Sequence, residues 1–388
     1  MKFVKTEDLK PGMRLAKPVF NKNGVMLYDR DTKLTGQGVN SIYNFGLIGL
    51  YILEQAEPLP PLTEADREFE RFQTVAVFKV KDMFAQIRRG KHPTQLGTLT
   101  ADIIRDYGDL KERINFMQNL RSAEDNVYKH TINTAILCAA IAGQMTLSAK
   151  EKNDLVTAAL LHDVGSLDIP EKIAIKTKEE LTETDIAAIY KYRDEGLRMV
   201  RDSCLLTGEV PRIITHFLAD IKNIEMKKFA SSSKSPETLT EILKVAYFYD
   251  VLTAMKFGEE PMSDIAAYRY LKHPRNMMNR QAVAALTRAI NIAPPGCTVQ
   301  FENGVKGIVI TDNPDDILRP FILSFKDNQI YNLADGKTYQ EYQIKDVMKT
   351  LDNRYIMTDK FKEYQERLAN GEGQTFKVGR KNGAKAKQ

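Results

Sequence analysis

The sequence predicts a mainly α-helical fold, in which an all-helical core lies between a small N-terminal and a small C-terminal β unit. Apolar residues recur at helical spacing through the middle of the chain. Near each end, an Asn-Gly pair stands between short apolar runs, at residues 23–24 and 303–304. Such pairs are typical of tight β-hairpin turns. At 388 residues, the chain has room for two or three domains.

The N-terminal β unit is expected over residues 1–62. Short strands are predicted at 19–20 and 25–28, followed by a helix over 38–45 and a strand over 47–53. Prolines at 58, 60 and 61 interrupt regular structure, and therefore place a boundary near residue 62.

Helices are expected from residue 63 to about 290. Thr63 followed by Asp66 resembles a capping box with Asp in place of Glu, and it opens a helical linker region over 63–120. The main helical domain follows over 121–292, until Pro294, Pro295 and Gly296 end it. A C-terminal β unit that ends in a helix is predicted over 293–370, with strands at 298–301, 305–310 and 321–325. Residues 371–388 have few core formers and should form a disordered basic tail.

Composition excludes several classes of protein. No apolar run approaches the roughly 18 residues needed to span a bilayer, so no membrane span is expected. Acidic Glu7 and Asp8 would break the apolar core of a signal peptide, and a cytoplasmic location is therefore expected. The three cysteines show no paired spacing, which argues against disulfides and zinc knuckles and predicts small core residues: Cys138, Cys204 and Cys297.

The net charge of +5 belongs mostly to the C-terminal tail. After residue 370 there are five basic residues and one acid, so the rest of the chain is nearly neutral. A nucleic-acid-binding surface requires clustered basic residues, and nucleic acid is therefore an unlikely partner of the body. The tail alone could touch RNA or anionic lipid, although a solubilising end explains it equally well.

The most informative segment is an apolar helix that runs directly into His162 and Asp163. A buried imidazole and carboxylate are costly unless they are paired or bind a metal. Together they offer nitrogen and oxygen ligands that suit iron, manganese or a similar ion. A second histidine, His130, opens another apolar helix, with Thr134 and Leu137 on the same face. Two interpretations of these residues are possible: a metal site, or a hydrogen-bonded polar cluster that holds the helices together.

These residues resemble the HD-GYP branch of the HD phosphohydrolase superfamily. The resemblance rests on His130 in Asn-Val-Tyr-Lys-His, on His162-Asp163-Val-Gly, on Ile169-Pro170, and on the Ala246–Thr253 helix. It implies an all-helical HD domain that holds two or three iron or manganese ions and hydrolyses cyclic di-GMP. Carried over to this chain, His130, His162 and Asp163 match three metal ligands, and His216 matches the first histidine of His-His-Glu.

Other family positions are changed. Tyr192 stands at the histidine of His-Pro-x-x-Gly, with Gly196 retained, and Tyr247 stands at an aspartate that is a metal ligand. Three further degenerate positions are Ser166, where the family has a lysine, Phe217, the second histidine of His-His-Glu, and Asn126, where some members have a carboxylate. The Gly-Tyr-Pro motif is missing.

The resemblance therefore implies a degenerate member with ligands for one divalent transition metal, or for none if the site has decayed. We expect a catalytically impaired signalling or scaffold protein that binds a cyclic dinucleotide, a protein partner or a second copy of itself. The alternative is an active metal-dependent phosphohydrolase. Tyr192, Tyr247 and Lys176 are candidate ligand-binding residues, through stacking on a guanine base and attraction of phosphate. Core filling is the competing explanation for the two tyrosines.

Overall fold

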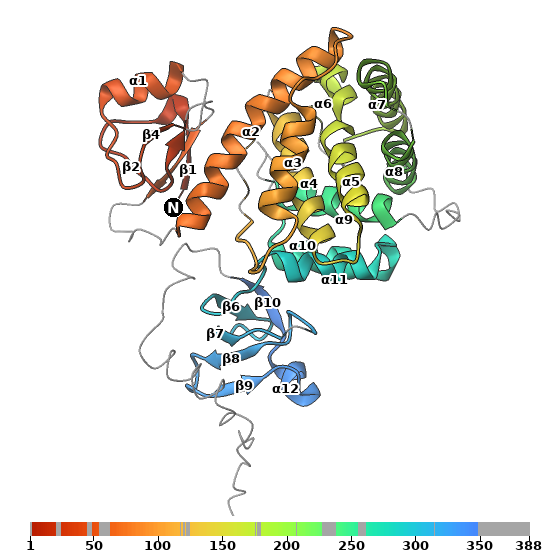
Figure 1. Cartoon of the computed structure of the whole chain (residues 1–388). Coiled ribbons are helices and arrows are strands. Elements are labelled where there is room, and N and C mark those ends of the chain that lie inside the picture. The colour runs from red at the N-terminus through yellow and green to blue at the C-terminus, as the bar shows by residue number, and fades with distance from the viewer. Residues whose placement is uncertain are drawn as a thin grey trace, which may run out of the picture. The chain divides into compact units, whose positions relative to one another are not determined.

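A computed structural model confirms the predicted fold class: the chain is mainly helical, with small antiparallel sheets near both ends (Figure 1). It describes residues 2–20, 25–44, 49–53, 63–116, 118, 121, 125–174, 176, 180–206, 208–226, 238–254, 261–313 and 315–347. The chain divides into two compact units, of which the second begins at Ala293. The finer boundaries at 62 and 120 stay predictions.

The N-terminal segment contains two small antiparallel sheets. Strands β1 (Lys2–Lys5), β5 (Gly49–Leu53) and β2 (Arg14–Leu15) form one sheet in the order β1-β5-β2. Strands β3 (Val19–Phe20) and β4 (Met26–Tyr28) form the other. Helix α1 (Gly36–Asn44) follows β4 and precedes β5 in the chain. The small apolar core of this segment includes Leu15, Leu34, Ile42 and Ile52. The Asn23-Gly24 turn lies outside the described residues.

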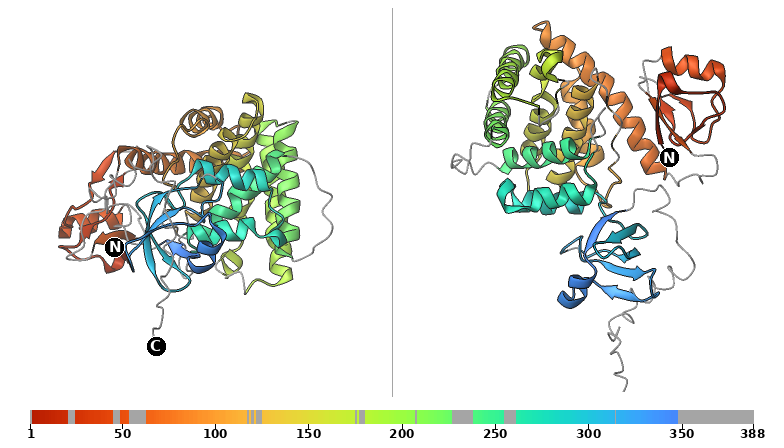
Figure 2. Two further views of the ribbon diagram at one scale, coloured as in Figure 1. Left: turned by 90° about the horizontal axis from the view of Figure 1, so that it is seen from below. Right: turned by 180° about the vertical axis from the view of Figure 1, so that it is seen from behind.

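The helical core is built around two adjacent helices, α4 (Asn126–Gly143) and α5 (Ala149–Leu161) (Figures 1 and 2). Helix α4 also packs against α2 (Glu64–Arg88), α3 (Leu96–Tyr107), α9 (Thr238–Thr253) and α11 (Arg280–Ala289). Every residue from His130 to Ala142 is buried as a result. A helix surrounded on all sides is apolar all round, which explains why α4 lacks a one-sided apolar stripe.

Further helices follow α5 in the chain, and of these α8 packs against α5 and α7 packs against α8. After a short 3-10 turn, η2 (Val164–Asp168), come α6 (Glu171–Ala174), α7 (Glu183–Cys204) and α8 (Glu209–Glu225). Helix α10 (Asp264–Lys272) packs on α9 and α11.

Side chains fix the start of several helices. The predicted box at the start of α2 is present: Thr63 accepts a hydrogen bond from the Asp66 amide, and the Asp66 carboxylate accepts one from the Thr63 amide. Ser148 and Glu151 form the same arrangement at α5. These reciprocal bonds satisfy amides that have no partner within the helix.

Two glycines hold α7 against η2. A Cβ atom on Gly165 would lie under 3.0 Å from the Tyr192 carbonyl, and one on Gly196 would lie equally close to the Gly165 backbone. No larger residue fits at either position without moving one of the backbones. This contact fixes the position of α7 beside the turn that carries Asp163.

The second unit contains one antiparallel sheet in the order β10-β6-β7-β8-β9. Its strands are β6 (Thr298–Phe301), β7 (Lys306–Thr311), β8 (Phe321–Ser324), β9 (Ile330–Asn332) and β10 (Ile344–Val347). Helix α12 (Gly336–Glu341) precedes β10. The Asn303-Gly304 pair forms the turn between β6 and β7, where Gly304 has a φ of +78° that glycine adopts without strain. Residues 348–388, which include the expected closing helix and basic tail, lie outside the described part.

Two expectations from composition can be compared with the structure. All three cysteines are free and buried. Within the described residues, no helix is long and apolar enough to cross a membrane.

The Gly165–Gly196 contact predicts that Gly196→Ala destabilises the protein by about 1–3 kcal/mol, because the new methyl group overlaps the backbone of η2. Urea unfolding measures the loss. Gly97→Ala is the matched control, since a Cβ there meets nothing within 4 Å and alanine favours the helix. Equal stability of the two variants would contradict the packing argument.

Candidate metal centre

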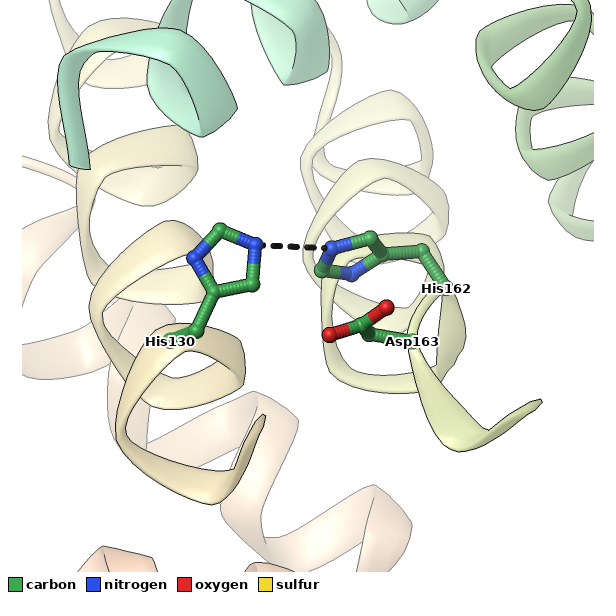
Figure 3. Close-up of side chains that lie close together, drawn as sticks. All are labelled: His130, His162 and Asp163. Carbon is green, nitrogen blue, oxygen red and sulfur yellow. Dashed lines mark hydrogen bonds between the residues drawn. The ribbon is translucent and has the colours of Figure 1, made fainter. Parts of the chain in front are cut away.

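Three buried side chains from two helices meet in the middle of the helical core (Figure 3). His130 lies on α4, one turn after the helix begins at Asn126 rather than at its first residue as predicted. His162 ends α5, and Asp163 follows it at the start of η2. One ligand atom from each residue lies within 4.8 Å of the other two. This buried group of three (His130, His162 and Asp163) is called the trio below.

The His162 ring is fixed by a backbone carbonyl. Its Nδ1 lies 2.7 Å from the Ala159 carbonyl oxygen, which can only accept a hydrogen bond, so Nδ1 carries the hydrogen. Burial lowers the pKa of His162 to about 4, against an opposing effect of Asp163. At neutral pH the ring is therefore uncharged, and its Nε2 presents a lone pair.

The His130 ring is fixed in the same sense by a carboxylate. Its Nδ1 lies 2.6 Å from Oδ2 of Asp250 on α9. A carboxylate behind a histidine sets the tautomer and makes the opposite nitrogen a better ligand. The Nε2 of His130 therefore also points its lone pair toward the middle of the trio.

Asp250 is completely buried and accepts several hydrogen bonds at once. Besides His130, its donors are Arg121 at 2.5 Å, Gln118 at 2.9 Å and Asn133 at 3.0 Å, all to Oδ1. Burial alone would raise the pKa of Asp250, but the charge of Arg121 and the hydrogen bonds from His130 and Arg121 hold it well below the usual range. Asp250 is thus a permanent anion behind His130.

The two imidazole rings face each other with their Nε2 atoms. The two Nε2 atoms, which the dashed line in Figure 3 joins, lie 3.4 Å apart. With both Nδ1 atoms protonated, two lone pairs point at each other, which is unfavourable unless a proton or a cation lies between them. Nitrogen and carboxylate donors suit a divalent transition metal. The donor set therefore fits one such ion.

The third member of the trio already has partners. Ser166 donates a short hydrogen bond to Oδ1 of Asp163. Arg193 on α7 donates to the Ser166 hydroxyl at 3.2 Å, and its Nε lies 3.6 Å from the same carboxylate oxygen. Asp163 is therefore part of an ion pair as well as of the trio.

Aromatic rings pack directly on the two histidines. The Tyr247 ring on α9 lies 4.9 Å from the His130 ring, and the Phe217 ring on α8 lies 5.4 Å from the His162 ring, between centroids. These two rings also contact each other at 5.2 Å. Burial raises the pKa of Tyr247 to about 12, so its phenol keeps its proton and is a poor metal ligand.

The other predicted site residues lie apart from the trio or at its edge. His216 is next to Phe217 in sequence but lines a surface depression of about 390 Å³ with Arg201 and Arg212. Lys176 binds Asp185 at the start of α7 at 2.7 Å. Tyr192 is half-buried, and its carbonyl contacts Gly165. Asn126 is one turn before His130, and its buried Oδ1 accepts no hydrogen bond from the described residues.

Sequence analysis missed most of the supporting residues. Asp250 lies in the Ala246–Thr253 helix on which the family resemblance partly rests, and a carboxylate in such an apolar helix is a signal that it needs partners. Nothing in the sequence singled out four others that contact Asp250 or Asp163: Gln118, Arg121, Asn133 and Arg193.

Asp250→Asn should destabilise the protein by about 3–5 kcal/mol. The change leaves the guanidinium of Arg121, whose side chain is 1% exposed, without a counter-ion in the core. Glu68→Gln is the control, because Glu68 and Arg71 form an exposed pair expected to contribute less than about 1 kcal/mol. Urea unfolding of both variants tests this, and a small loss for Asp250→Asn would refute the buried-anion account.

Stability should fall as pH drops from about 6.5 to 4. The unfolded chain protonates His162 below its ordinary value of about 6.5, whereas the folded protein resists protonation until about 4. Protons therefore favour the unfolded state across this window, by up to about 3 kcal/mol. Urea unfolding of metal-free protein against pH should show a shallower decline for His162→Gln. Identical pH profiles would contradict the buried neutral imidazole.

Residues 115–278, which contain the trio and Asp250, match the family described as HD domain. No significant match was found among solved structures.

Two curated relatives share low identity with the chain. A cyclic di-GMP phosphodiesterase of Pseudomonas aeruginosa is 23% identical over 252 residues, which cover 63% of this chain and 59% of the relative. A cyclic di-GMP phosphodiesterase of Borreliella burgdorferi is 27% identical over 197 residues, half of each chain. The chain thus spans between half and three fifths of the length of these relatives. Over these residues the chain is similar to HD domains and, at low identity, to two cyclic di-GMP phosphodiesterases.

Proposed function

We propose that this HD domain acts by binding rather than by turnover, as a signalling or scaffold domain with one divalent transition-metal site. The metal, iron or manganese, would be held by His130, His162 and Asp163. The observation that carries the proposal is the convergence of the two Nε2 atoms beside one carboxylate, enclosed by the rings of Tyr247 and Phe217.

Ligand number supports a single ion. Two metals that clamp a phosphodiester need ligands on both sides of the attacked phosphorus. Here the Phe217 and Tyr247 rings pack on the histidines and on each other, at the positions where the family resemblance would place a histidine and an aspartate. Hydrolysis of cyclic di-GMP by a two-metal mechanism should therefore be weak or absent.

The proposed ligand class is a cyclic dinucleotide, in keeping with the named activity of the two relatives. The role first considered for Tyr247, stacking on guanine, is disfavoured because its ring is 5% exposed and packed against His130 and Phe217. Core filling explains Tyr247 better. A protein partner or a second copy of the chain remains the other proposed binding partner.

A second candidate is an active metal-dependent phosphohydrolase with the trio as its centre. The converging histidine lone pairs favour it, because a divalent ion bound there would polarise a phosphoryl oxygen and lower the pKa of a bound water. His162 and His130 would hold the ion, and Asp250 would keep the His130 ring oriented.

Metal content and cyclic di-GMP turnover of the same preparation distinguish the two candidates. After anaerobic loading with Mn²⁺ or Fe²⁺, we expect one ion per chain by mass spectrometry and no sustained release of linear dinucleotide. The double variant His162→Ala and Asp163→Ala should lose the ion while retaining the helical circular dichroism spectrum.

Glu68→Gln, remote from the trio, serves as the matched control and should keep the ion. Sustained turnover that depends on the bound metal, with one ion or with two ions per chain, would reject the binding proposal in favour of the phosphohydrolase.

A further inference from the structure

A buried guanidinium lies against the trio, at a position that the family resemblance does not explain. The Arg193 side chain is 12% exposed and Asp163 is 6% exposed. Charges that leave water this completely are stable only with a partner of opposite sign and with their hydrogen bonds satisfied. The contacts of Arg193 therefore show which buried carboxylate it pairs with.

Arg193 reaches Asp163 both directly and through Ser166. Its Nε lies 3.6 Å from Oδ1 of Asp163 and donates to the Ser166 hydroxyl, which in turn donates to the same Oδ1. Its Nη2 donates to the Tyr247 hydroxyl at 3.2 Å. Its carbon Cζ lies 5.3 Å from the centre of the Tyr190 ring, a cation–π distance.

The chain fold places the backbone of Arg193 close to the turn that carries Asp163. Gly165 and Gly196 allow α7 to approach η2 backbone to backbone, and Tyr192, the residue before Arg193, forms part of that contact. Arg193 is therefore held on the side of α7 that faces Asp163.

Both buried carboxylates beside the histidines consequently have a guanidinium of their own. Asp250 is paired with Arg121, and Asp163 is paired with Arg193. A divalent ion at the trio would share Asp163 with Arg193 and would add two positive charges next to an existing one.

We propose that Arg193 is an internal cation that neutralises Asp163 and lowers the affinity of the trio for divalent metal ions. The inference rests on the proposed function of the trio as an ion site. Arg193 would thereby determine how strongly the trio binds a divalent ion, because the protein itself supplies part of the positive charge that a metal would otherwise bring.

The test compares Mn²⁺ affinity by isothermal titration of the full-length wild type with that of Arg193→Gln. Removing the charge should tighten binding by about tenfold or more. Arg193→Lys keeps the charge, and Arg198→Gln removes an exposed charge from the same helix. Both controls should stay within about twofold of the wild type. The gain should vanish when Asp163→Asn is added to Arg193→Gln.

Binding by Arg193→Gln that equals or falls below that of the wild type would overturn the proposal. If a neutral residue at position 193 prevents folding, Ser166→Ala provides the test. It removes the hydroxyl that links Nε of Arg193 to Oδ1 of Asp163, so Mn²⁺ should bind severalfold more tightly. No gain in Mn²⁺ affinity would overturn the proposal.

The same data keep this inference distinct from the proposed function. Suppose that the wild type binds one ion, that Asp163→Asn loses it, and that Arg193→Gln shows no gain in Mn²⁺ affinity. This result would contradict the inference about Arg193 and leave the proposed function intact. Sustained turnover by the wild type would contradict the proposed function.

Discussion

The arrangement of the candidate centre depends on one buried anion, the carboxylate of Asp250. A carboxylate excluded from water is stable only when its oxygens are satisfied, and here Gln118, Arg121, Asn133 and His130 all bond to it. These donors come from α4 and the segment before it, whereas Asp250 lies on α9. The interaction thus ties two central helices together and also fixes the His130 ring, so that its Nε2 faces His162.

The charges around the trio form two pairs with different consequences. Asp250, paired with Arg121, orients the His130 ring by bonding to its Nδ1. This pair strengthens the site because it leaves His130 Nε2 free to bind a metal. The pair of Asp163 and Arg193 competes for a ligand oxygen. One buried pair therefore prepares the centre for a cation, while the other opposes a cation. This balance is the physical basis for expecting the trio to bind a divalent ion weakly.

Local patterns in the sequence were sufficient to predict part of this picture. The helical core, the capping box at Thr63 and the convergence of His130, His162 and Asp163 follow from apolar periodicity and from polar residues at the ends of buried helices. The network around Asp250 could not be predicted in the same way, because Asp250 lies more than 100 residues from its donors in the chain and pairs with them only after folding. The facing directions of neighbours on one helix, such as His216 and Phe217, likewise depend on how α8 packs.

Anomalous X-ray scattering from crystals soaked in millimolar Mn²⁺ tests the central claim most directly, because it locates ions without reference to activity. The account predicts one manganese peak per chain, bound by the Nε2 atoms of His130 and His162 and by Asp163, with His130 Nδ1 still bonded to Asp250. Two peaks about 4 Å apart, as in a two-metal hydrolase, or no peak at the trio, would contradict it.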